Sequence, residues 1–132
     1  MLASFVSTYF FIPCSIFTEK LSGLETFVKY LKENKNISFK EIADLLKRSQ
    51  KTIWQTYNQS KKKYPDILQE KFSLYQIPIS ILQQRHIAVL EHIVAYLKEQ
   101  YHLSFSKIAE ITKRDPKTIW TVYNRARKKY AQ

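Results

Sequence analysis

Apolar residues recur at helical spacing in three consecutive segments of the chain, and the same three segments then occur a second time. In the first segment, residues 22–33, they fall at i, i+3, i+4 and i+7, which places them on one helix face. These positions are Leu24, Phe27, Val28 and Leu31, and their counterparts in the second copy are Leu90, Ile93, Val94 and Leu97. The chain has a single Gly and lacks period-2 alternation. The pattern therefore predicts an all-α protein.

A second helix is predicted to begin after Ser38, whose hydroxyl can cap it, with Glu41 completing a capping box. In the second copy Ser104 holds the capping position, but Lys107 replaces the glutamate, so this cap should be weaker. The apolar side of these helices is Phe39, Ile42, Ala43 and Leu45 in the first copy, and Phe105, Ile108, Ala109 and Ile111 in the second.

The third helix belongs to an 18-residue stretch that occurs at residues 47–64 (KRSQKTIWQTYNQSKKKY) and again at residues 113–130 (KRDPKTIWTVYNRARKKY). Ser49 and Asp115 are good N-caps, and Pro116 suits the first helical position. The predicted inward residues are Ile53, Tyr57, Ser60 and Tyr64, matched by Ile119, Tyr123, Ala126 and Tyr130. The predicted outward residues are Lys51, Trp54, Gln55, Asn58, Lys61 and Lys62 in the first copy, and Lys117, Trp120, Thr121, Asn124, Arg127 and Lys128 in the second.

The repeat predicts two tandem three-helix helix-turn-helix modules. The first spans residues 1–64, the linker residues 65–76, and the second module residues 77–132. The linker contains Ile67, Leu68, Phe72 and Leu74, so we expect it to pack, as a short helix, rather than to act as a flexible tether. The uncharged N-terminus is apolar, but its residues 12–17 reappear at residues 77–82 within ordinary soluble sequence. This favours a packed part of the repeat over a membrane segment.

The net charge of +11 points to a polyanionic partner. Residues 47–64 and residues 113–130 each carry six net positive charges, so the rest of the chain is nearly neutral. A surface that only needed to be soluble would mix charge signs along every helix. A solvated helix end favoured by the helix dipole is the simpler explanation of such basic runs. That explanation does not require outward Trp and Asn at matching positions.

Other classes of chemistry find little support in the sequence. Cys14 is the only cysteine, which excludes an internal disulfide and fits a cytoplasmic protein. His86, His92 and His102 have no spacing typical of a zinc site. Paired acids, a nucleophile with its base and a phosphate-binding loop are not recognisable. We expect no enzymatic activity, no catalytic residue, no metal and no cofactor.

Residues 38–64 and 104–130 resemble the helix-turn-helix of region four of bacterial sigma factors. The resemblance is clearest in the second copy, through Leu103-Ser104-Phe105, Ile108-Ala109-Glu110-Ile111, Thr118-Ile119 and the basic ending at residues 125–130. It departs from the family at the turn, where Lys47 and Lys113 replace the usual glycine. The resemblance implies base contacts from the start of the third helix, at Gln50, Lys51 and Gln55, and at Pro116, Lys117 and Thr121. The other sigma regions are missing.

The sequence thus predicts a sequence-specific double-stranded DNA-binding protein, a nucleoid-associated transcriptional regulator that acts as a monomer or homodimer. Lys, Gln, Asn and Arg side chains can read base edges in the major groove, while neighbouring cations neutralise phosphates. The expected DNA-binding residues are Gln50, Lys51, Trp54, Gln55, Asn58, Lys61, Lys62, Lys117, Trp120, Thr121, Asn124, Arg125, Arg127 and Lys128. RNA binding, with Trp and Tyr stacked on unpaired bases, and a protein adaptor of the transcription machinery are the alternatives. A membrane partner is not expected.

Overall fold

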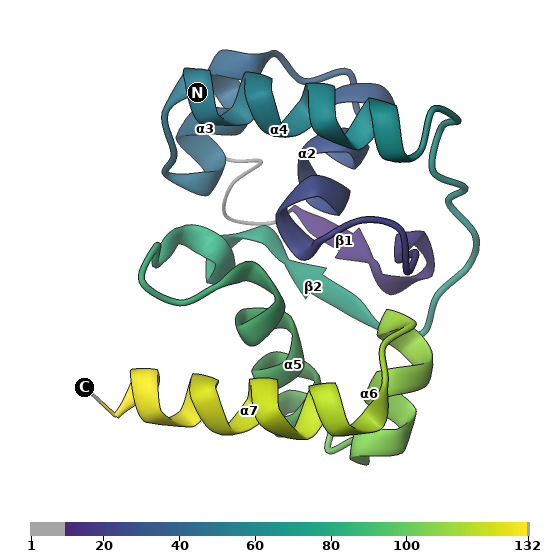
Figure 1. Cartoon of the computed structure of the whole chain (residues 1–132), viewed down its shortest axis with the longest axis vertical. Helices are drawn as coiled ribbons and strands as arrows, with labels where there is room; N and C mark the ends of the chain where they lie inside the picture. Colours follow the sequence, from purple (N-terminus) through teal and green to yellow (C-terminus); the bar gives the residue numbers. More distant parts are fainter. Residues whose placement is uncertain (1–9, 132) are drawn as a thin grey trace.

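The structure is a computed structural model that describes residues 10–131, and six α-helices dominate this part of the chain (Figure 1). Strand β1 (Phe11–Pro13) and the 3-10 turn η1 (Cys14–Ile16) precede α2 (Gly23–Glu33), α3 (Phe39–Leu46) and α4 (Gln50–Lys63). Strand β2 (Gln76–Pro78) and η2 (Ile79–Gln83) precede α5 (Val89–Gln100), α6 (Phe105–Thr112) and α7 (Pro116–Tyr130). The prediction of a mostly helical chain is confirmed.

The helices begin where the capping residues predict. The Ser22 hydroxyl accepts the Glu25 N–H, and the Glu25 carboxylate accepts the Ser22 N–H, which forms a full capping box on α2. The Ser38 and Ser104 hydroxyls each accept one backbone N–H, at the starts of α3 and α6. The predicted capping box at Ser38 is not completed, because the Glu41 side chain does not accept the Ser38 N–H. Local sequence therefore determines where these helices begin.

The apolar stripes are buried in one core that runs through both halves of the molecule. Phe27, Val28 and Leu31 of α2 are fully buried, as are Ile93, Val94 and Leu97 of α5. Ser60 of α4 and Ala126 of α7 are also fully buried, as predicted for the inward faces of the third helices. The small side chains at these two positions allow α4 to approach α2, and α7 to approach α5, closely.

A short antiparallel sheet, formed by β1 and β2, corrects the prediction of a purely helical protein. Ile12 pairs with Ile77, its own counterpart in the second copy, while Phe11 pairs with Pro78 and Pro13 with Gln76. Both isoleucines are fully buried. A register in which equivalent residues face each other places an approximate twofold axis between Ile12 and Ile77.

The two copies exchange the segments that follow these strands. The turn η1 packs against α6 of the second copy, and η2 packs against α3 of the first. Two backbone hydrogen bonds stabilise the exchanged turns. The Cys14 N–H donates to the Tyr75 carbonyl, and the Ile79 N–H donates to the Phe10 carbonyl. Ile16, Ile79 and Leu82 bring apolar side chains from these turns into the core. Each set of three helices is therefore completed by a turn from the other copy.

The linker differs from the prediction, because it forms no helix and buries only one of its four apolar side chains. Leu68 is buried, whereas Ile67, Phe72 and Leu74 are exposed. Polar contacts hold the segment in place instead. The Tyr30 hydroxyl donates to the Glu70 carboxylate at 2.6 Å, and the Asn34 amide donates to the Leu68 carbonyl at 2.9 Å. The linker is attached to α2 by these bonds, with little apolar burial of its own.

Candidate nucleic-acid interface

A tight turn precedes each of the two basic helices, α4 and α7. Lys47 ends α3 in the left-handed conformation with φ 57°, and Lys113 ends α6 with the same φ. Lysine occurs less often than glycine in this region of φ/ψ space, yet both copies adopt it at the same position. Ser49 and Asp115 then cap the next helix by accepting the N–H groups of Thr52 and Lys117. The turn geometry is therefore the same in both copies, although the usual glycine is missing.

The exposed face of α4 consists of long polar side chains around one tryptophan. Trp54 is 55% exposed, and its neighbours Lys51 and Gln55 are exposed with free ends. Asn58 is half-buried, and its amide donates to the Trp54 carbonyl at 2.9 Å. Gln50, Lys61 and Lys62 complete the exposed set. All the predicted site residues of the first copy therefore lie on one helix, although the Asn58 amide is engaged with its own backbone.

The second copy presents the same arrangement on α7. Trp120 is 59% exposed, and the Asn124 amide donates to the Trp120 carbonyl at 2.9 Å, as Asn58 does to Trp54. Thr121 replaces Gln55, and its hydroxyl donates to the Lys117 carbonyl, so its reach is shorter. Lys117, Arg125, Arg127 and Lys128 are exposed. The two faces therefore share a framework and differ in the groups they would present to a ligand.

Two lysines of the basic runs are neutralised by carboxylates within the described chain. The Lys63 ammonium lies 2.8 Å from the Glu25 carboxylate, and the Lys129 ammonium lies 2.7 Å from the Glu91 carboxylate. Burial acts to raise the pKa of Glu25, but the hydrogen bonds from Lys63 and Ser22 outweigh it and lower the pKa. Glu25 therefore stays ionised and holds Lys63. The exposed charges left for a polyanion are Lys51, Lys61 and Lys62 on α4, and Lys117, Arg125, Arg127 and Lys128 on α7.

The basic runs also contain two arginines that hold the copies together. The Arg114 guanidinium donates to the carbonyls of Thr18 and Leu21 in the first copy, at 3.1 and 2.7 Å. The Arg48 guanidinium lies 3.4 Å from the carbonyl of Leu82 in the second copy. Both side chains are half-buried, and their burial lowers the pKa of each arginine. Sequence reasoning counted these charges with the interface, but the guanidinium groups bind backbone carbonyls inside the protein.

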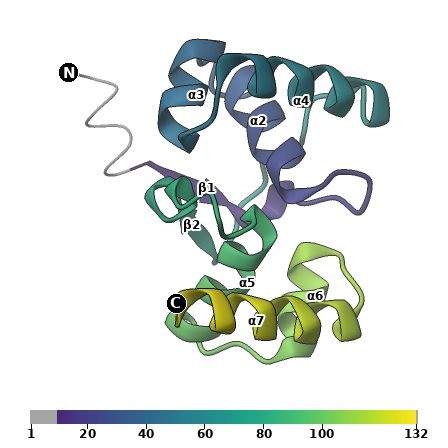
Figure 2. The same cartoon turned by 60° about the vertical axis from the view of Figure 1, so that its left-hand side comes forward.

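The helices α4 and α7 lie at opposite ends of the long axis and run in opposite directions (Figure 1). They keep these places in the view turned by 60° (Figure 2). This placement follows from the approximate twofold axis at the sheet, which relates one basic helix to the other. Two equivalent basic faces are thus held by one continuous core.

Tyr64 and Tyr130, which the helical spacing assigned to the inward face, end up in different surroundings. Tyr64 is half-buried next to Lys20 and Lys29, each 6.0 Å from the ring centroid. Tyr130 is 47% exposed, so the prediction of a buried side chain is wrong for this residue. Its hydroxyl lies 2.6 Å from Nδ1 of His92. The end of α7 therefore differs from the end of α4.

Among residues 10–131, no three His, Cys, Asp or Glu side chains come close enough together to hold a metal ion. None of the helices described is both long and apolar enough to cross a membrane.

Comparisons with known proteins give no relative for this chain: no protein-family model, curated protein or solved structure matches it. The resemblance to sigma region four stays a prediction that rests on the quoted residues.

Proposed function

We propose that the chain binds double-stranded DNA sequence-specifically, using α3–α4 and α6–α7 as two helix-turn-helix units with α4 and α7 as recognition helices. This proposal is supported by the matched exposed faces of α4 and α7. Each of these helices follows a turn with a lysine in the left-handed conformation and begins at a side chain that caps it. Both faces combine basic residues with amide or hydroxyl side chains. This combination suits a helix that enters the major groove and contacts bases and phosphates together.

The charge distribution supports a division of labour along each recognition helix. Lys61 and Lys62 near the end of α4, and Arg127 and Lys128 near the end of α7, are exposed and free to neutralise phosphates. Neutralised phosphates release counterions, which would supply most of the affinity. Nearer the starts of the helices, Gln55 and Thr121 occupy the same position with different chemistry, so the two half-sites should differ in sequence.

The approximate twofold arrangement supports simultaneous binding of both helices to one duplex. Dimeric helix-turn-helix proteins present two recognition helices to successive major grooves, about 10 base pairs apart. Here one chain would take the place of a dimer, because the exchanged turns contact α3 and α6, the helices that precede α4 and α7. A regulator built in this way needs no second subunit. Its place in the cell would be the cytoplasm, in association with the nucleoid.

Trp54 and Trp120 give the alternative ligand, single-stranded RNA or DNA, a specific basis. Both indoles are more than half exposed at matching positions of the basic helices. Aromatic side chains on a basic surface stack on unpaired bases, at about 1–3 kcal/mol per base. Duplex DNA remains the proposal because the side chains around each indole have the donor and acceptor groups that read base edges.

The deciding experiment compares the intact chain on duplex DNA, on single-stranded DNA and on RNA at two salt concentrations, by fluorescence anisotropy. We expect the tightest binding to duplex DNA, with affinity that falls steeply as salt rises. Binding that prefers single strands would favour the stacking alternative. Weak binding to all three, without salt dependence, would contradict both the duplex proposal and the single-strand alternative.

A charge-matched pair of variants separates the interface from total charge. Lys61→Ala/Lys62→Ala removes two exposed charges from α4, and should flatten the slope of log K against log salt by about 2. Lys20→Ala/Lys71→Ala removes two charges from exposed positions outside α4 and α7, and should leave the slope nearly unchanged. Equal effects from the two variants would contradict a role for α4.

A further inference from the structure

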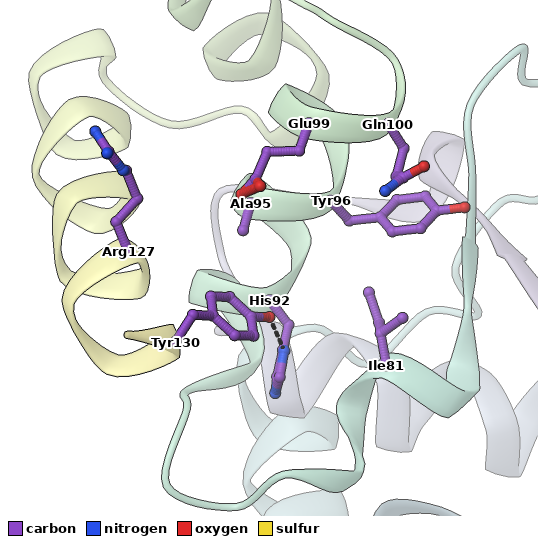
Figure 3. Close-up of a pocket in the computed structure, with 8 residues that line it drawn as sticks. All are labelled: Ile81, His92, Ala95, Tyr96, Glu99, Gln100, Arg127 and Tyr130. Carbon is purple, nitrogen blue, oxygen red and sulfur yellow. Dashed lines mark hydrogen bonds between the residues drawn. The ribbon is translucent and has the colours of Figure 1, made fainter. Parts of the chain in front are cut away.

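A cavity of about 330 Å³ lies between α5, α7 and η2 (Figure 3). Helix α5 contributes His92, Ala95, Tyr96, Glu99 and Gln100 to its lining. Ile81 comes from η2, and Arg127 and Tyr130 come from α7. Its walls combine two aliphatic side chains, two phenol rings and an imidazole with one amide, one guanidinium and one carboxylate. A pocket of this size and mixed character suits a small organic ligand.

The first copy shows what fills the corresponding space there. Lys29 is the counterpart of Ala95, and it is a lysine whose side chain is completely buried. Its ammonium is ion-paired with the carboxylate of Glu33, one helical turn along α2. The same ammonium lies 6.0 Å from the ring centroid of Tyr64. A buried lysine requires such partners, because an unpaired buried ammonium is costly.

The second copy keeps the partners of that ammonium but lacks the lysine. Glu99 is the counterpart of Glu33 and Tyr130 that of Tyr64, and both line the cavity. Figure 3 shows the Glu99 carboxylate directed back toward Ala95. Among the ion pairs of residues 10–131 none involves Glu99. Because the second copy has alanine where the first has lysine, a space lies next to the Glu99 carboxylate. This carboxylate has no cationic partner among the described residues.

The remaining polar groups leave this carboxylate available. The Arg127 guanidinium lies over the ring of Tyr123, 6.0 Å from its centroid, and makes no ion pair with Glu99. His92 Nε2 lies 3.2 Å from the Gln84 carbonyl, which can only accept a hydrogen bond. Nε2 therefore carries a proton, and Nδ1 accepts from the Tyr130 hydroxyl at 2.6 Å. Burial of the imidazole lowers the pKa of His92, so this residue adds no positive charge at neutral pH.

We propose that this cavity binds a small aliphatic primary ammonium ion, which occupies the place that the Lys29 side chain takes in the first copy. The ammonium group pairs with the Glu99 carboxylate and lies near the Tyr130 ring. The alkyl part covers Ala95 and Ile81. The first copy shows the arrangement expected for this complex. There the Lys29 ammonium, which belongs to the chain itself, lies with the Glu33 carboxylate and the Tyr64 ring.

The test is an NMR titration of the intact chain with n-propylammonium chloride, at ionic strength held constant with sodium chloride. Propylammonium corresponds to the part of the lysine side chain that alanine lacks. We expect saturable shifts at Ala95, Glu99 and Tyr130, and none around Lys29, where the covalent ammonium already fills the site. 1-Propanol, which has the same chain length without the charge, should produce no saturable shift at these residues.

Two variants of the cavity decide the assignment. Ala95→Lys supplies an internal ammonium and should weaken propylammonium binding at least tenfold, as should Glu99→Gln, which removes the carboxylate charge from an exposed position. Lys29→Ala should create a second set of saturable shifts around Glu33 and Tyr64. If that variant does not fold, the first two variants still decide. The proposal is overturned if wild type shows no saturable shift, if Ala95→Lys binds as tightly as wild type, or if 1-propanol binds equally.

Discussion

The two copies of the repeat keep the same turns and ion pairs but differ in several of the side chains that they carry. Both copies use a lysine in the left-handed conformation before the basic helix, and both pair a lysine near the end of that helix with a glutamate on the first helix. In contrast, the buried Lys29 corresponds to Ala95, and the exposed Gln55 to Thr121. Framework positions are constrained by both copies at once, because each copy completes the core of the other.

Cutting the chain in the linker should produce the largest effect, because each copy needs a turn from the other. Residues 1–69 alone lack Ile79 and Leu82, which are fully buried. Burial of one such side chain contributes about 1.5–3 kcal/mol, and total stability is only about 5–15 kcal/mol. We expect neither 1–69 nor 70–132 to unfold cooperatively alone, by circular dichroism in urea, while an equimolar mixture recovers a cooperative transition. A half that folds alone would show that the exchange is dispensable.

The arginines that cross between the copies should come next, and they should be unequal. Arg114 donates to two carbonyls of the other copy, whereas Arg48 has one longer contact of that kind. Hydrogen bonds from a charged group contribute about 1.5–3 kcal/mol each. Arg114→Met should therefore lower the free energy of unfolding by about 3 kcal/mol, and Arg48→Met by about 1 kcal/mol. Urea denaturation measures both, and a larger loss for Arg48→Met would contradict the asymmetry.

Gly23 provides a smaller test of the twofold packing. A Cβ built on Gly23 would lie 3.0 Å from a methyl of Val89, its counterpart in the second copy, and 3.2 Å from the backbone nitrogen of Leu90. Overpacking of this kind typically costs about 1–3 kcal/mol. We expect Gly23→Val to destabilise the chain by about 2 kcal/mol in the same assay.

The exchange variant Gly23→Val/Val89→Gly is the control for that prediction. It keeps one valine and one glycine at the axis, on opposite sides, and should recover most of the lost stability. If the double variant were less stable than Gly23→Val, the two positions would not be packed as equivalents.

The helices, their caps and most of their buried faces could be predicted from sequence, because they depend on spacing within one segment. The sheet could not, since each strand has three residues, too few to show alternation, and its partner lies in the other copy. For the same reason the predicted modules at 1–64 and 77–132 gave no hint that η1 and η2 are exchanged. The linker was predicted to pack because it has four apolar side chains, but only Leu68 is buried.

Some residues of the two basic runs bind partners inside the protein, whereas others are exposed to solvent. The exposed positions of α4 and α7 followed from helical spacing and were placed as expected. Arg48, Arg114, Lys63 and Lys129 belong to the same basic runs, but their partners are far away in the sequence, so charge alone could not separate them. The sequence shows that Lys29 and Ala95 occupy equivalent positions in the two copies. The cavity at Ala95 could not be predicted from this difference, because it depends on how the helices pack.

A hydroxyl-radical footprint of the intact chain, on a duplex selected from a random library, tests most directly whether two recognition helices read one duplex. We predict two protected tracts about 10 base pairs apart, with unlike sequences. Lys61→Ala/Lys62→Ala should weaken protection of one tract first, and Arg127→Ala/Lys128→Ala that of the other. A single protected tract, or loss of the same tract in both variants, would contradict the account.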